Sequence, residues 1–465
     1  MKGKFYITSA IVYTNAPPHI GFSLEIIQAD VLARYHRFLG DDVFFLTGTD
    51  EHGAKIVRAA EKAGRTPLEF TDEISKKYQE LTKSLNLSND DFIRTTDQKR
   101  HWPGVRKAWL VIKEKGDIYK KKYKGLYCVG CEAFVKEKDL VDGRCPIHKQ
   151  KPEIIEEENY FFKLSKYADI VKEKIVSGEI KIVPDVRKNE IISFINQGVE
   201  DVSCSRSRAN LQWGIPVPDD DSQIIYVWFE ALINYLFPKK YWPADVHCIG
   251  KDIFRFHALL WPAMLLSLKL DLPKIIFVHG HITSGGQKMS KSLGNVVDPF
   301  ELVKKYGADA VRYFLLREIP SSEDGDFSEE KFKERYNGDL ASGLGNLVAR
   351  VTKLAQVSKI KKTGNERGLI AGYKIALKAS KEKYKESLER FEFSAVLAAV
   401  WTLIKFCDRE VERNKLWEKS DNQKEIIDNL LFLIGEIAKL LEPFLPETSQ
   451  KILKKETGGS LFPRI

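Results

Sequence analysis

The chain has 465 residues, of which 43% are hydrophobic and 30% are charged, and its net charge is +9. This length allows roughly two to four domains with large cores. The positive charge suits a protein that binds a polyanion, although many basic proteins never bind nucleic acid. No run of about eighteen apolar residues occurs, so we expect no membrane span. Residues 1–4 lead directly into an apolar strand and leave no room for a signal peptide, so we expect a cytoplasmic protein.

An apolar run over residues 5–10 predicts a short buried strand, which two prolines end. A helical pattern follows from Leu24 to Phe38. This order is typical of the nucleotide-binding crevice of a doubly wound α/β sheet, where the helix N-terminus faces phosphate. In the turn, His19 can donate a hydrogen bond to a phosphate oxygen, and Gly21 lets a nucleotide lie against the backbone. Alone, a histidine after a proline is more often an ordinary surface residue.

Residues 42–46 predict a second strand, which ends in Thr47-Gly48-Thr49-Asp50 at the edge where ligands of such sheets bind. Asp50 can pair with the ammonium of an amino acid or cap the next helix, and both interpretations stay open. Thr66-Pro67-Leu68-Glu69 has the form of a capping box with proline at the first helical position. It predicts a helix that reaches Leu85, and another helix is predicted over 98–115.

A short, basic and cysteine-bearing segment begins at residue 116. Cys128-Val129-Gly130-Cys131 and Cys145-Pro146-Ile147-His148 have C-x2-C and C-x2-H spacing. These four ligands complete a tetrahedral set without an open position, so we predict one structural Zn²⁺ in a reducing compartment. The alternative is four unconnected thiol and imidazole groups. Cys204, Cys248 and Cys407 lie outside the pattern and are predicted to be ordinary buried residues.

The chain then returns to strand and helix patterns. Residues 184–197 predict a helix that Gly198 ends, and residues 224–227 predict a buried strand. Trp228, Ala231 and Tyr235 follow on one helical face. By itself, an aromatic stripe of this kind more often indicates core packing than a ligand pocket.

Two further strands are predicted at 246–249 and before His279. Gly250-Lys251-Asp252 lies at the carboxyl end of the first, where a carboxylate can accept hydrogen bonds from ribose hydroxyls. Next comes Gly285-Gly286-Gln287-Lys288-Met289-Ser290-Lys291-Ser292-Leu293-Gly294-Asn295. Its glycines free the backbone, and its lysines suit a polyphosphate whose charge moves to the leaving group. The alternative is a solvated basic turn.

Helices dominate the rest of the chain. Asp298-Pro299 predicts a helix start, and residues 308–317 are helical in pattern. From Leu340 onward, repeated apolar faces predict a bundle of helices.

Two of these stretches, His19-Ile20-Gly21-Phe22 and Lys288-Met289-Ser290-Lys291-Ser292, resemble the HIGH and KMSKS motifs that bracket ATP in class I aminoacyl-tRNA synthetases. Within that class, the chain resembles the methionyl-tRNA synthetase family over nearly its whole length. Further stretches carry this resemblance: Tyr13-Thr14-Asn15, residues 44–53 (FFLTGTDEHG), 189–195 (NEIISFI), 226–232 (YVWFEAL) and 250–253 (GKDI).

The resemblance implies an α/β fold with a Rossmann-type doubly wound parallel sheet, a zinc-bearing connective insertion and an all-α C-terminal bundle. Its parts are the two catalytic halves (1–115 and 225–284), the insertion (116–224), the KMSKS loop with a linking domain (285–339) and the anticodon-binding domain (340–465). The insertion is short, whereas relatives specific for isoleucine, valine and leucine carry a much longer editing domain there.

The activity implied is methionine–tRNA ligation: L-methionine reacts with ATP, accompanied by Mg²⁺, and the methionyl group passes to tRNA(Met). The resemblance assigns catalysis to His19, Lys288 and Lys291. It places ATP against His19, Gly21, Phe22, Glu25, Gly250, Asp252, His279, Lys288 and Lys291. It places methionine against Ala10, Ile11, Tyr13, Asp50, Trp228, Ala231, Tyr235, Phe256 and His257.

Two positions depart from the family pattern. Phe22 stands where the family usually has a histidine that helps stabilise the phosphate transition state, and phenylalanine cannot donate a hydrogen bond. The resemblance assigns anticodon contact to Asn346, Arg350 and Trp417, but Leu416 replaces the usual proline before the tryptophan.

Two rival functions stay open at this point. A cysteinyl-tRNA synthetase has similar loops, but its zinc binds substrate thiol and needs an open position. A non-catalytic tRNA-binding paralogue is favoured by Phe22 alone. The chain ends after the bundle, without the C-terminal tRNA-binding domain that brings some relatives together as dimers, so we expect a monomer.

Overall fold

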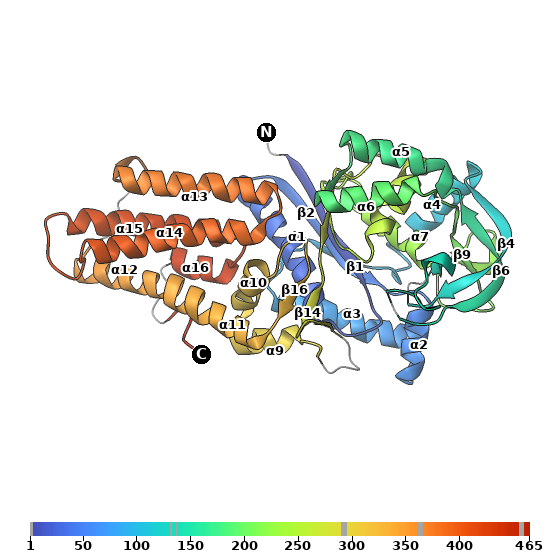
Figure 1. Cartoon of the computed structure of the whole chain (residues 1–465), viewed down its shortest axis with the longest axis horizontal. Coiled ribbons are helices and arrows are strands. Elements are labelled where there is room, and N and C mark those ends of the chain that lie inside the picture. The colour runs from blue at the N-terminus through green and yellow to red at the C-terminus, as the bar shows by residue number, and fades with distance from the viewer. Residues whose placement is uncertain are drawn as a thin grey trace. The chain divides into compact units, whose positions relative to one another are not determined.

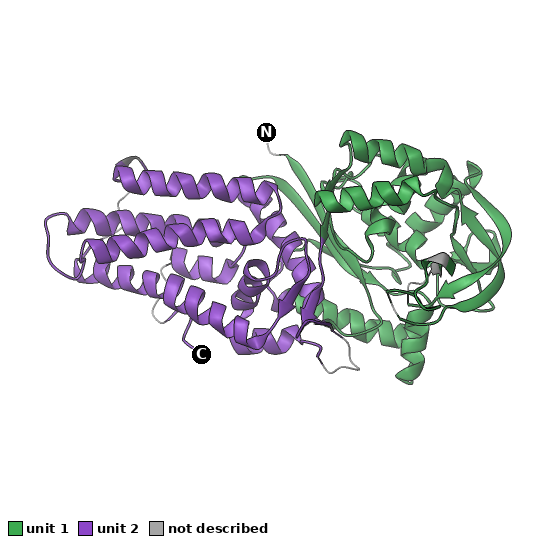
Figure 2. Cartoon of the chain, in the orientation of Figure 1, with its two compact units in different colours: residues 1–18, 39–82, 88–278 green, residues 19–38, 83–87, 279–465 purple. Residues whose placement is uncertain are grey.

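The computed structural model describes residues 3–130, 133–135, 137–147, 149–289, 295–360, 366–454 and 460–465. The chain forms two compact units, which Figure 2 shows in different colours. Unit 1 comprises residues 1–18, 39–82 and 88–278, and unit 2 comprises residues 19–38, 83–87 and 279–465. Among the described helices, none has both the length and the apolar character needed to cross a membrane.

A six-stranded sheet organises unit 1, in the order β3-β2-β1-β12-β13-β7. Figure 1 labels its strands β1 and β2. β1 pairs in parallel with β2 and β12, β2 with β3, and β13 with β7. The predicted α/β fold with a parallel sheet is therefore confirmed. The strands are β1 (Lys4–Tyr13), β2 (Asp42–Asp50), β3 (Asp91–Arg94), β7 (Lys181–Val183), β12 (Val246–Gly250) and β13 (Ile275–His279).

The central strands are apolar because a parallel sheet is covered on both faces. Residues 5–10 of β1 and all five residues of β12 are buried. Trp109 and Trp261 are fully buried in the same core cluster as Tyr6 and Leu46. The predicted strand at 5–10 is confirmed, and it continues to Tyr13.

A bulge interrupts the pairing of β1 with β2. Thr8 lies opposite Leu46, but Ile11 lies opposite Gly48, so β1 carries one extra residue. Such bulges redirect side chains and are common beside active sites. The residues that follow, Ala10 to Tyr13, form the half of β1 that reaches the carboxyl edge of the sheet.

The helices of unit 1 follow the predicted pattern. The capping box is confirmed: the Thr66 N–H donates to Glu69 Oε2 at 3.0 Å, and the Glu69 N–H donates to Thr66 Oγ1 at 3.3 Å. Gly198 follows α6 with a φ of 89°, as predicted for a helix end. The helices are α2 (Ala54–Lys62), α3 (Pro67–Ser84), α4 (Trp102–Glu114), α5 (Leu164–Ser177), α6 (Asp185–Asn196), α7 (Val227–Ala231) and α8 (Trp261–Leu268).

Two details of the prediction are wrong. Gly53, and not Asp50, is the N-cap of α2, so Asp50 belongs to the strand. The strand expected at 224–227 ends at Ile225, and Val227 already begins α7. Apolar residues at a strand-to-helix junction suit both elements, so hydrophobicity did not separate them.

Two smaller sheets occupy the chain between α4 and α7. One has the order β5-β4-β6-β8, with β4 (Ile118–Cys128), β5 (Ala133–Val135), β6 (Glu153–Phe162) and β8 (Val202–Ser203). The other has the order β10-β11-β9, with β9 (Ser205–Ser207), β10 (Pro216–Val217) and β11 (Asp220–Ile225). In the chain, β7 and α6 lie between β6 and β8 but belong to neither small sheet. Instead, β7 joins the edge of the main sheet.

Unit 2 contains α1 (Ile20–Leu39), a small sheet and the C-terminal helices. The sheet has β14 (Ile282–Ser284) between β15 (Gln287–Lys288) and β16 (Gly325–Phe327). Asp298 caps α9 as predicted, accepting a hydrogen bond from the Phe300 N–H at 2.8 Å. The remaining helices are α9 (Pro299–Tyr306), α10 (Ala308–Arg317), α11 (Glu329–Arg335), a π-helical segment (Tyr336–Gly345), α12 (Asn346–Val357), α13 (Ala371–Glu389), α14 (Phe393–Arg413), α15 (Gln423–Leu441) and α16 (Pro446–Lys454).

The helical bundle predicted from Leu340 onward is confirmed. Figure 1 shows α12, α13, α14 and α15 side by side, and α14 packs against both α13 and α15. Their amphipathic faces are buried toward one another, as Val396, Leu397 and Val400 of α14 and Leu430 and Leu433 of α15 illustrate.

Arg312 on α10 is the central buried cation of unit 2. It is fully buried, and its Nη1 lies 2.8 Å from Asp30 Oδ2 on α1. Nη1 also donates to the Leu85 carbonyl oxygen at 3.3 Å, and Nη2 and Nε donate to the carbonyl oxygens of Pro443 and Phe444, each at 2.8 Å. One side chain therefore ties α1 to the chain segments at 83–87 and 443–444.

We predict that Arg312→Met lowers the free energy of unfolding by about 3–5 kcal/mol, because three carbonyl oxygens lose a buried donor and Asp30 loses a buried cation, although Arg34 still pairs with it at 2.8 Å. Denaturant titration followed by circular dichroism measures this change. Arg390→Met is the matched control, because Arg390 pairs with Glu386 at 2.8 Å while 60% of its side chain is exposed. The control should lose about 1 kcal/mol or less. Equal losses in the two variants would contradict the role given to Arg312.

Candidate active site

A small pocket lies in unit 1 at the carboxyl edge of β1 and β2. Its walls come from the end of β1, the end of β2, α7 with the 3-10 turn Leu232–Leu236, and the segment that precedes α8. Ten residues line it: Ala10, Ile11, Asp50, Trp228, Ala231, Leu232, Asn234, Tyr235, Ile253 and His257. Seven of these were predicted for methionine, so the structure brings most of that set together.

Tyr13 and Phe256 complete the predicted set but do not line this pocket. Phe256 stacks on Trp228 with a centroid separation of 4.1 Å and an interplanar angle of 5°. It therefore supports the indole ring from behind. Tyr13 ends β1 opposite Asp50, and the Lys55 ammonium lies 5.6 Å from its ring centroid.

Tyr235 and His257 form a polar pair in the apolar wall. The Tyr235 hydroxyl lies 2.8 Å from His257 Nε2, and His257 Nδ1 lies 3.1 Å from the Ile253 carbonyl oxygen. Burial lowers the pKa of His257 to about 4, so the ring is neutral near pH 7. Because the carbonyl can only accept, the ring proton is on Nδ1, and Tyr235 donates to Nε2. The tyrosine oxygen thereby keeps a fixed position in the wall.

Sequence reasoning missed Leu232, Asn234 and Ile253. Leu232 lies four residues after Trp228, and Ile253 lies four before His257, so helical spacing from predicted residues was the available signal. Asn234 is the polar residue within an apolar run, and it is almost fully buried. Its amide nitrogen donates to the Ala231 carbonyl at 2.5 Å, while Oδ1 has no hydrogen-bond partner among the described residues. This oxygen can accept a hydrogen bond from a ligand.

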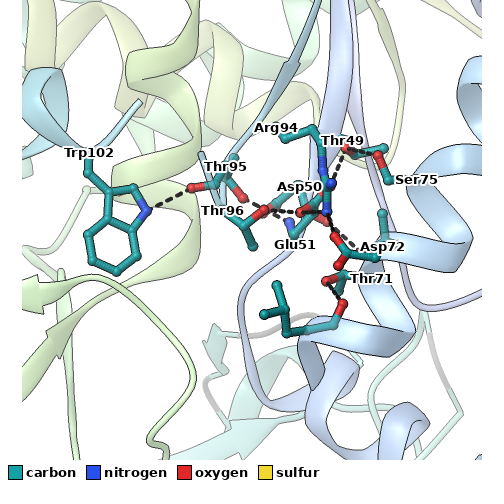
Figure 3. Close-up of polar contacts among 12 residues, drawn as sticks. Thr49, Asp50, Glu51, Thr71, Asp72, Ser75, Arg94, Thr95, Thr96 and Trp102 are labelled. Carbon is teal, nitrogen blue, oxygen red and sulfur yellow. Dashed lines mark hydrogen bonds and ion pairs between the residues drawn. The ribbon is translucent and has the colours of Figure 1, made fainter. Parts of the chain in front are cut away.

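The peptide groups around Asp50 are held by surrounding donors and acceptors. The Asp50 carbonyl accepts from the Thr14 N–H at 3.0 Å and from the Thr14 hydroxyl at 3.1 Å. The Glu51 N–H donates to Thr95 Oγ1 at 2.9 Å, and the Trp213 indole donates to the Glu51 carbonyl at 2.6 Å. Figure 3 shows Asp50 among polar side chains at this point. The backbone that carries the Asp50 carboxylate is therefore fixed on both sides.

Glu230 links α7 to the segment after β2. This fully buried carboxylate lies 2.8 Å from His52 Nδ1 and 2.6 Å from His101 Nε2. Burial opposes its charge, but the charges and hydrogen bonds of the two histidines outweigh burial and lower the pKa of Glu230. Because Glu230 lies between Trp228 and Ala231, this cluster fixes the apolar wall of the pocket relative to the Asp50 segment.

The His19 motif and the described residues at either end of the lysine loop lie together in unit 2. The Ile20 N–H donates to the Val297 carbonyl at 3.1 Å, which ties the start of α1 to the residues after the lysine loop. A Cβ atom at Gly21 would lie 2.8 Å from the His19 ring and 3.9 Å from Met289 Cε. The Gly21 N–H donates to His19 Nδ1 at 3.1 Å. A neutral His19 ring therefore carries its proton on Nε2, where it can donate to a phosphate.

Glu25 and His279 also meet in unit 2. His279 Nε2 lies 2.9 Å from Glu25 Oε2, and His279 Nδ1 lies 2.7 Å from the Gly280 carbonyl. Both ring nitrogens face acceptors, so a proton is shared within the Glu25–His279 pair. Phe22 lies one turn before Glu25 and is buried. The remaining predicted ATP residues, Gly250 and Asp252, lie in unit 1 at the carboxyl end of β12, where the Ile253 N–H donates to the Gly250 carbonyl at 3.3 Å.

The lysine loop begins as a hairpin. Gly285 and Gly286 have φ values of 63° and 71°, a left-handed pair that suits the tight turn between β14 and β15. Asp326 anchors the turn, because its Oδ1 accepts from the Gly286 N–H at 2.8 Å and from the Thr283 hydroxyl at 2.7 Å. These hydrogen bonds, led by that of Gly286, lower the pKa of Asp326. The backbone of Lys288 lies in β15, whereas its side chain and the whole of Lys291 lie outside the described residues.

Of the four predicted zinc ligands, the structure describes Cys128 and Cys145. Cys128 ends β4 and Cys145 lies in the turn that Lys149 closes, where the Lys149 N–H donates to the Cys145 carbonyl at 2.8 Å. Both thiols are almost fully buried. Cys131 and His148 lie outside the described residues, and no group of three or more metal-binding side chains occurs in the part of the chain that is described. Two buried sulfur donors, each at the end of a strand or in a turn, fit a thiolate site.

The predicted anticodon residues belong to the helical bundle and to the residues that follow α14. Asn346 begins α12, and Arg350 follows one turn later with its Nη2 2.6 Å from Glu412 Oε1 on α14. Trp417 follows the end of α14 and is 56% exposed, whereas Leu416 is fully buried. An exposed indole is available for stacking on a base.

Comparisons with known proteins agree with this architecture. A family model for "tRNA synthetases class I (M)" matches residues 5–149 and 131–352, and one for "Anticodon-binding domain of tRNA ligase" matches residues 376–462. The methionine–tRNA ligase of Thermotoga maritima is 42% identical, covering 97% of this chain and 75% of its own. That of Brucella suis is 39% identical, covering 97% and 91%.

The solved structures give the same result. The chain is similar to Mycobacterium tuberculosis methionyl-tRNA synthetase in complex with methionyl-adenylate, with a TM-score of 0.91, 36% identity and full coverage of both chains. Family models, curated relatives and this solved structure thus agree over nearly the whole chain, which belongs to the methionine-specific class I tRNA synthetases.

Proposed function

We infer that the chain is a methionine–tRNA ligase, a cytoplasmic enzyme that converts L-methionine and ATP to methionyl-adenylate and transfers the methionyl group to the 3′-terminal adenosine of tRNA(Met). The observation that carries this conclusion is the pocket in unit 1. It combines Asp50 with an apolar wall of Trp228, Ala231 and Tyr235 at a strand edge. The relatives compared are methionine–tRNA ligases, and these comparisons do not favour a cysteinyl or non-catalytic alternative.

The pocket chemistry suits methionine at both ends. The Asp50 carboxylate pairs with the substrate ammonium, and Asn234 Oδ1 offers a second acceptor. A thioether is apolar and polarisable and gains from contact with ring edges, which Trp228 and Tyr235 supply. The shape of a pocket alone discriminates between amino acids by roughly 1–3 kcal/mol per methylene. The fixed Tyr235 oxygen adds a polar contact that increases the selectivity for the methionine side chain. Tyr13 and Phe256 complete the proposed methionine set from its margins.

Adenylation needs no side-chain nucleophile. A methionine carboxylate oxygen forms a bond to the α-phosphorus, the bond from that phosphorus to the bridging oxygen breaks, and pyrophosphate leaves. Positioning and electrostatic stabilisation then carry the step. We assign the charge stabilisation to His19, Lys288 and Lys291. The other proposed ATP contacts are Gly21, Phe22, Glu25, Gly250, Asp252 and His279, and Mg²⁺ accompanies the nucleotide.

The remaining parts are assigned by the same reasoning. Residues 1–115 and 225–284 form the catalytic domain, 116–224 the insertion, 285–339 the loop and linking domain, and 340–465 the anticodon-binding domain. Cys128, Cys131, Cys145 and His148 hold one structural Zn²⁺. Asn346, Arg350 and Trp417 contact the anticodon, with Trp417 stacking on an unpaired base. The enzyme acts as a monomer.

We predict that the wild-type enzyme catalyses ATP–pyrophosphate exchange with methionine and not with cysteine. Lys291→Ala should lower the exchange rate by on the order of a hundredfold, because a cation at the departing pyrophosphate is lost. Methionine binding, measured by calorimetry, should stay unchanged. Lys304→Ala, on the exposed face of α9, is the control and should keep the wild-type rate. Equal losses of exchange and methionine binding in Lys291→Ala would contradict the assigned role.

Phe22 generates a second prediction. The Phe22→His variant should raise the adenylation rate, by up to about a hundredfold, because a hydrogen-bond donor returns beside the phosphates. Single-turnover formation of methionyl-adenylate measures the rate directly. An unchanged or lower rate, in a variant with wild-type methionine affinity, would show that another donor already fills this role or that the position is not used.

Metal analysis tests the zinc assignment. The purified wild-type chain should contain about one zinc, the stoichiometry of a closed four-ligand site. Cys145→Ala should lose this zinc because the tetrahedral set is broken. Cys407→Ala, a buried cysteine of α14 outside the pattern, should keep it. Retention of zinc in Cys145→Ala would remove that residue from the ligand set.

A further inference from the structure

Glu51 follows Asp50 directly, and its carboxylate is fully buried. Figure 3 shows polar side chains converging on it. Arg94 donates from Nε to Oε1 at 2.7 Å and from Nη2 to Oε2 at 2.9 Å. The Thr49 hydroxyl donates to Oε1 at 2.6 Å, and the Thr96 hydroxyl donates to Oε2. Four donor contacts therefore hold the carboxylate in one orientation.

The donors themselves are fixed by neighbouring elements. Arg94 ends β3, directly opposite Thr49 of β2, so the two strand ends bring the pair together. Arg94 Nη2 also donates to Asp72 Oδ1 on α3 at 2.5 Å. Ser75 of α3 lies 3.1 Å from Thr49 Oγ1, and it must donate because the Thr49 proton points to Glu51. Burial works against the charge on Arg94, but Glu51 and Asp72 outweigh it and raise the pKa of this guanidinium.

The hydrogen-bond network around Glu51 compensates the buried charge of this carboxylate. Two adjacent carboxylates lie at the edge of the methionine pocket, and one of them, Glu51, has no access to water. A buried carboxylate without a counter-charge is strongly unfavourable. It would either take up a proton or move toward the nearest cation, which in the occupied pocket is the substrate ammonium. Bidentate pairing with Arg94 removes that competition and orients the planar carboxylate.

We propose that Glu51 and Arg94 are positioning residues for methionine: Arg94 neutralises and locks Glu51, so that Asp50 alone presents its charge to the ammonium in a fixed geometry. This inference rests on the proposed function of the same pocket. Neither residue touches the substrate, because neither lines the pocket. Their effect passes through the Asp50–Glu51 peptide, which Thr14 and Thr95 already hold, while Trp213 holds the next peptide at the Glu51 carbonyl.

The test is steady-state ATP–pyrophosphate exchange in the full-length chain, with methionine and ATP varied separately. Arg94→Met should raise KM for methionine by about tenfold or more and leave KM for ATP within about twofold, because loss of one partner of a buried charge pair acts where that charge lies. Arg94→Lys keeps the charge but loses the bidentate geometry, and it should give an intermediate KM for methionine. The lysine variant also keeps the experiment informative if Arg94→Met does not fold.

Arg58→Met is the matched control. Arg58 on α2 makes the same bidentate contact with Glu153, at 3.1 Å for both hydrogen bonds, but about half of each side chain is exposed. The substitution is identical in size and charge, and the pair lies in the same unit. Both KM values should stay within about twofold of wild type, because exposed pairs contribute little.

A double variant separates compensation of charge from general stability. Glu51→Gln with Arg94→Met removes both charges. One of the Thr49 and Thr96 hydroxyls can still donate to the amide oxygen, and the other can accept from the amide NH2 group. The double variant should bring KM for methionine most of the way back from the raised value of Arg94→Met to the wild-type value, whatever its melting temperature. A purely structural role predicts the opposite, because two core substitutions destabilise more than one.

Three outcomes would overturn the inference: a KM for methionine in Arg94→Met within about twofold of wild type, equal increases in KM for both substrates, or no recovery in the double variant. The proposed function fails separately. If the wild-type chain shows no methionine-dependent exchange, the function is wrong before any variant is compared. If wild type and Arg58→Met are active but the Arg94 variants give one of these three outcomes, only the positioning role is lost.

Discussion

The Asp50–Glu51 peptide at the carboxyl end of β2 is the element on which the substrate pocket depends. A parallel sheet brings the ends of β1, β2 and β3 to one edge, and each end contributes a partner: Thr14 after β1, Thr49 within β2, and Arg94 with Thr95 from β3. Because these groups are buried, every hydrogen bond there is costly to leave unmade. The peptide is therefore held in one conformation, which also fixes the backbone that carries the Asp50 carboxylate.

The apolar wall is attached to this peptide through a second buried charge. Glu230 holds both His52, two residues after Asp50, and His101 at the start of α4. The Asp50 side and the aromatic wall of the pocket are thus tied together, which would pre-organise the site for the proposed substrate. In unit 2, the Ile20–Val297 hydrogen bond and the Asp326 anchor play the corresponding part for the two nucleotide motifs.

Much of the fold was predictable because local patterns agree with the final structure. The first strand, the capping box at Thr66, the helix end at Gly198 and the helical bundle follow from hydrophobic periodicity and from residues with special backbone or capping roles. Prediction failed where tertiary contacts override local preference. Asp50 has the composition of a helix cap, yet pairing with β1 extends β2 through it. Seven residues of the pocket were predicted from resemblance, as part of a set that we propose for methionine, while Leu232, Asn234 and Ile253 needed the three-dimensional surface.

The sequence by itself determined the class of fold and the family, because short motifs with fixed spacing such as His19-Ile20-Gly21-Phe22 and Lys288-Met289-Ser290-Lys291-Ser292 are legible without coordinates. Only the tertiary structure decided which charges compensate one another. Glu51 and Arg94 are 43 residues apart, and Glu230 and His52 are 178 apart. No local pattern connects such residues, because their pairing is set by strand order and by the cost of burying a charge alone.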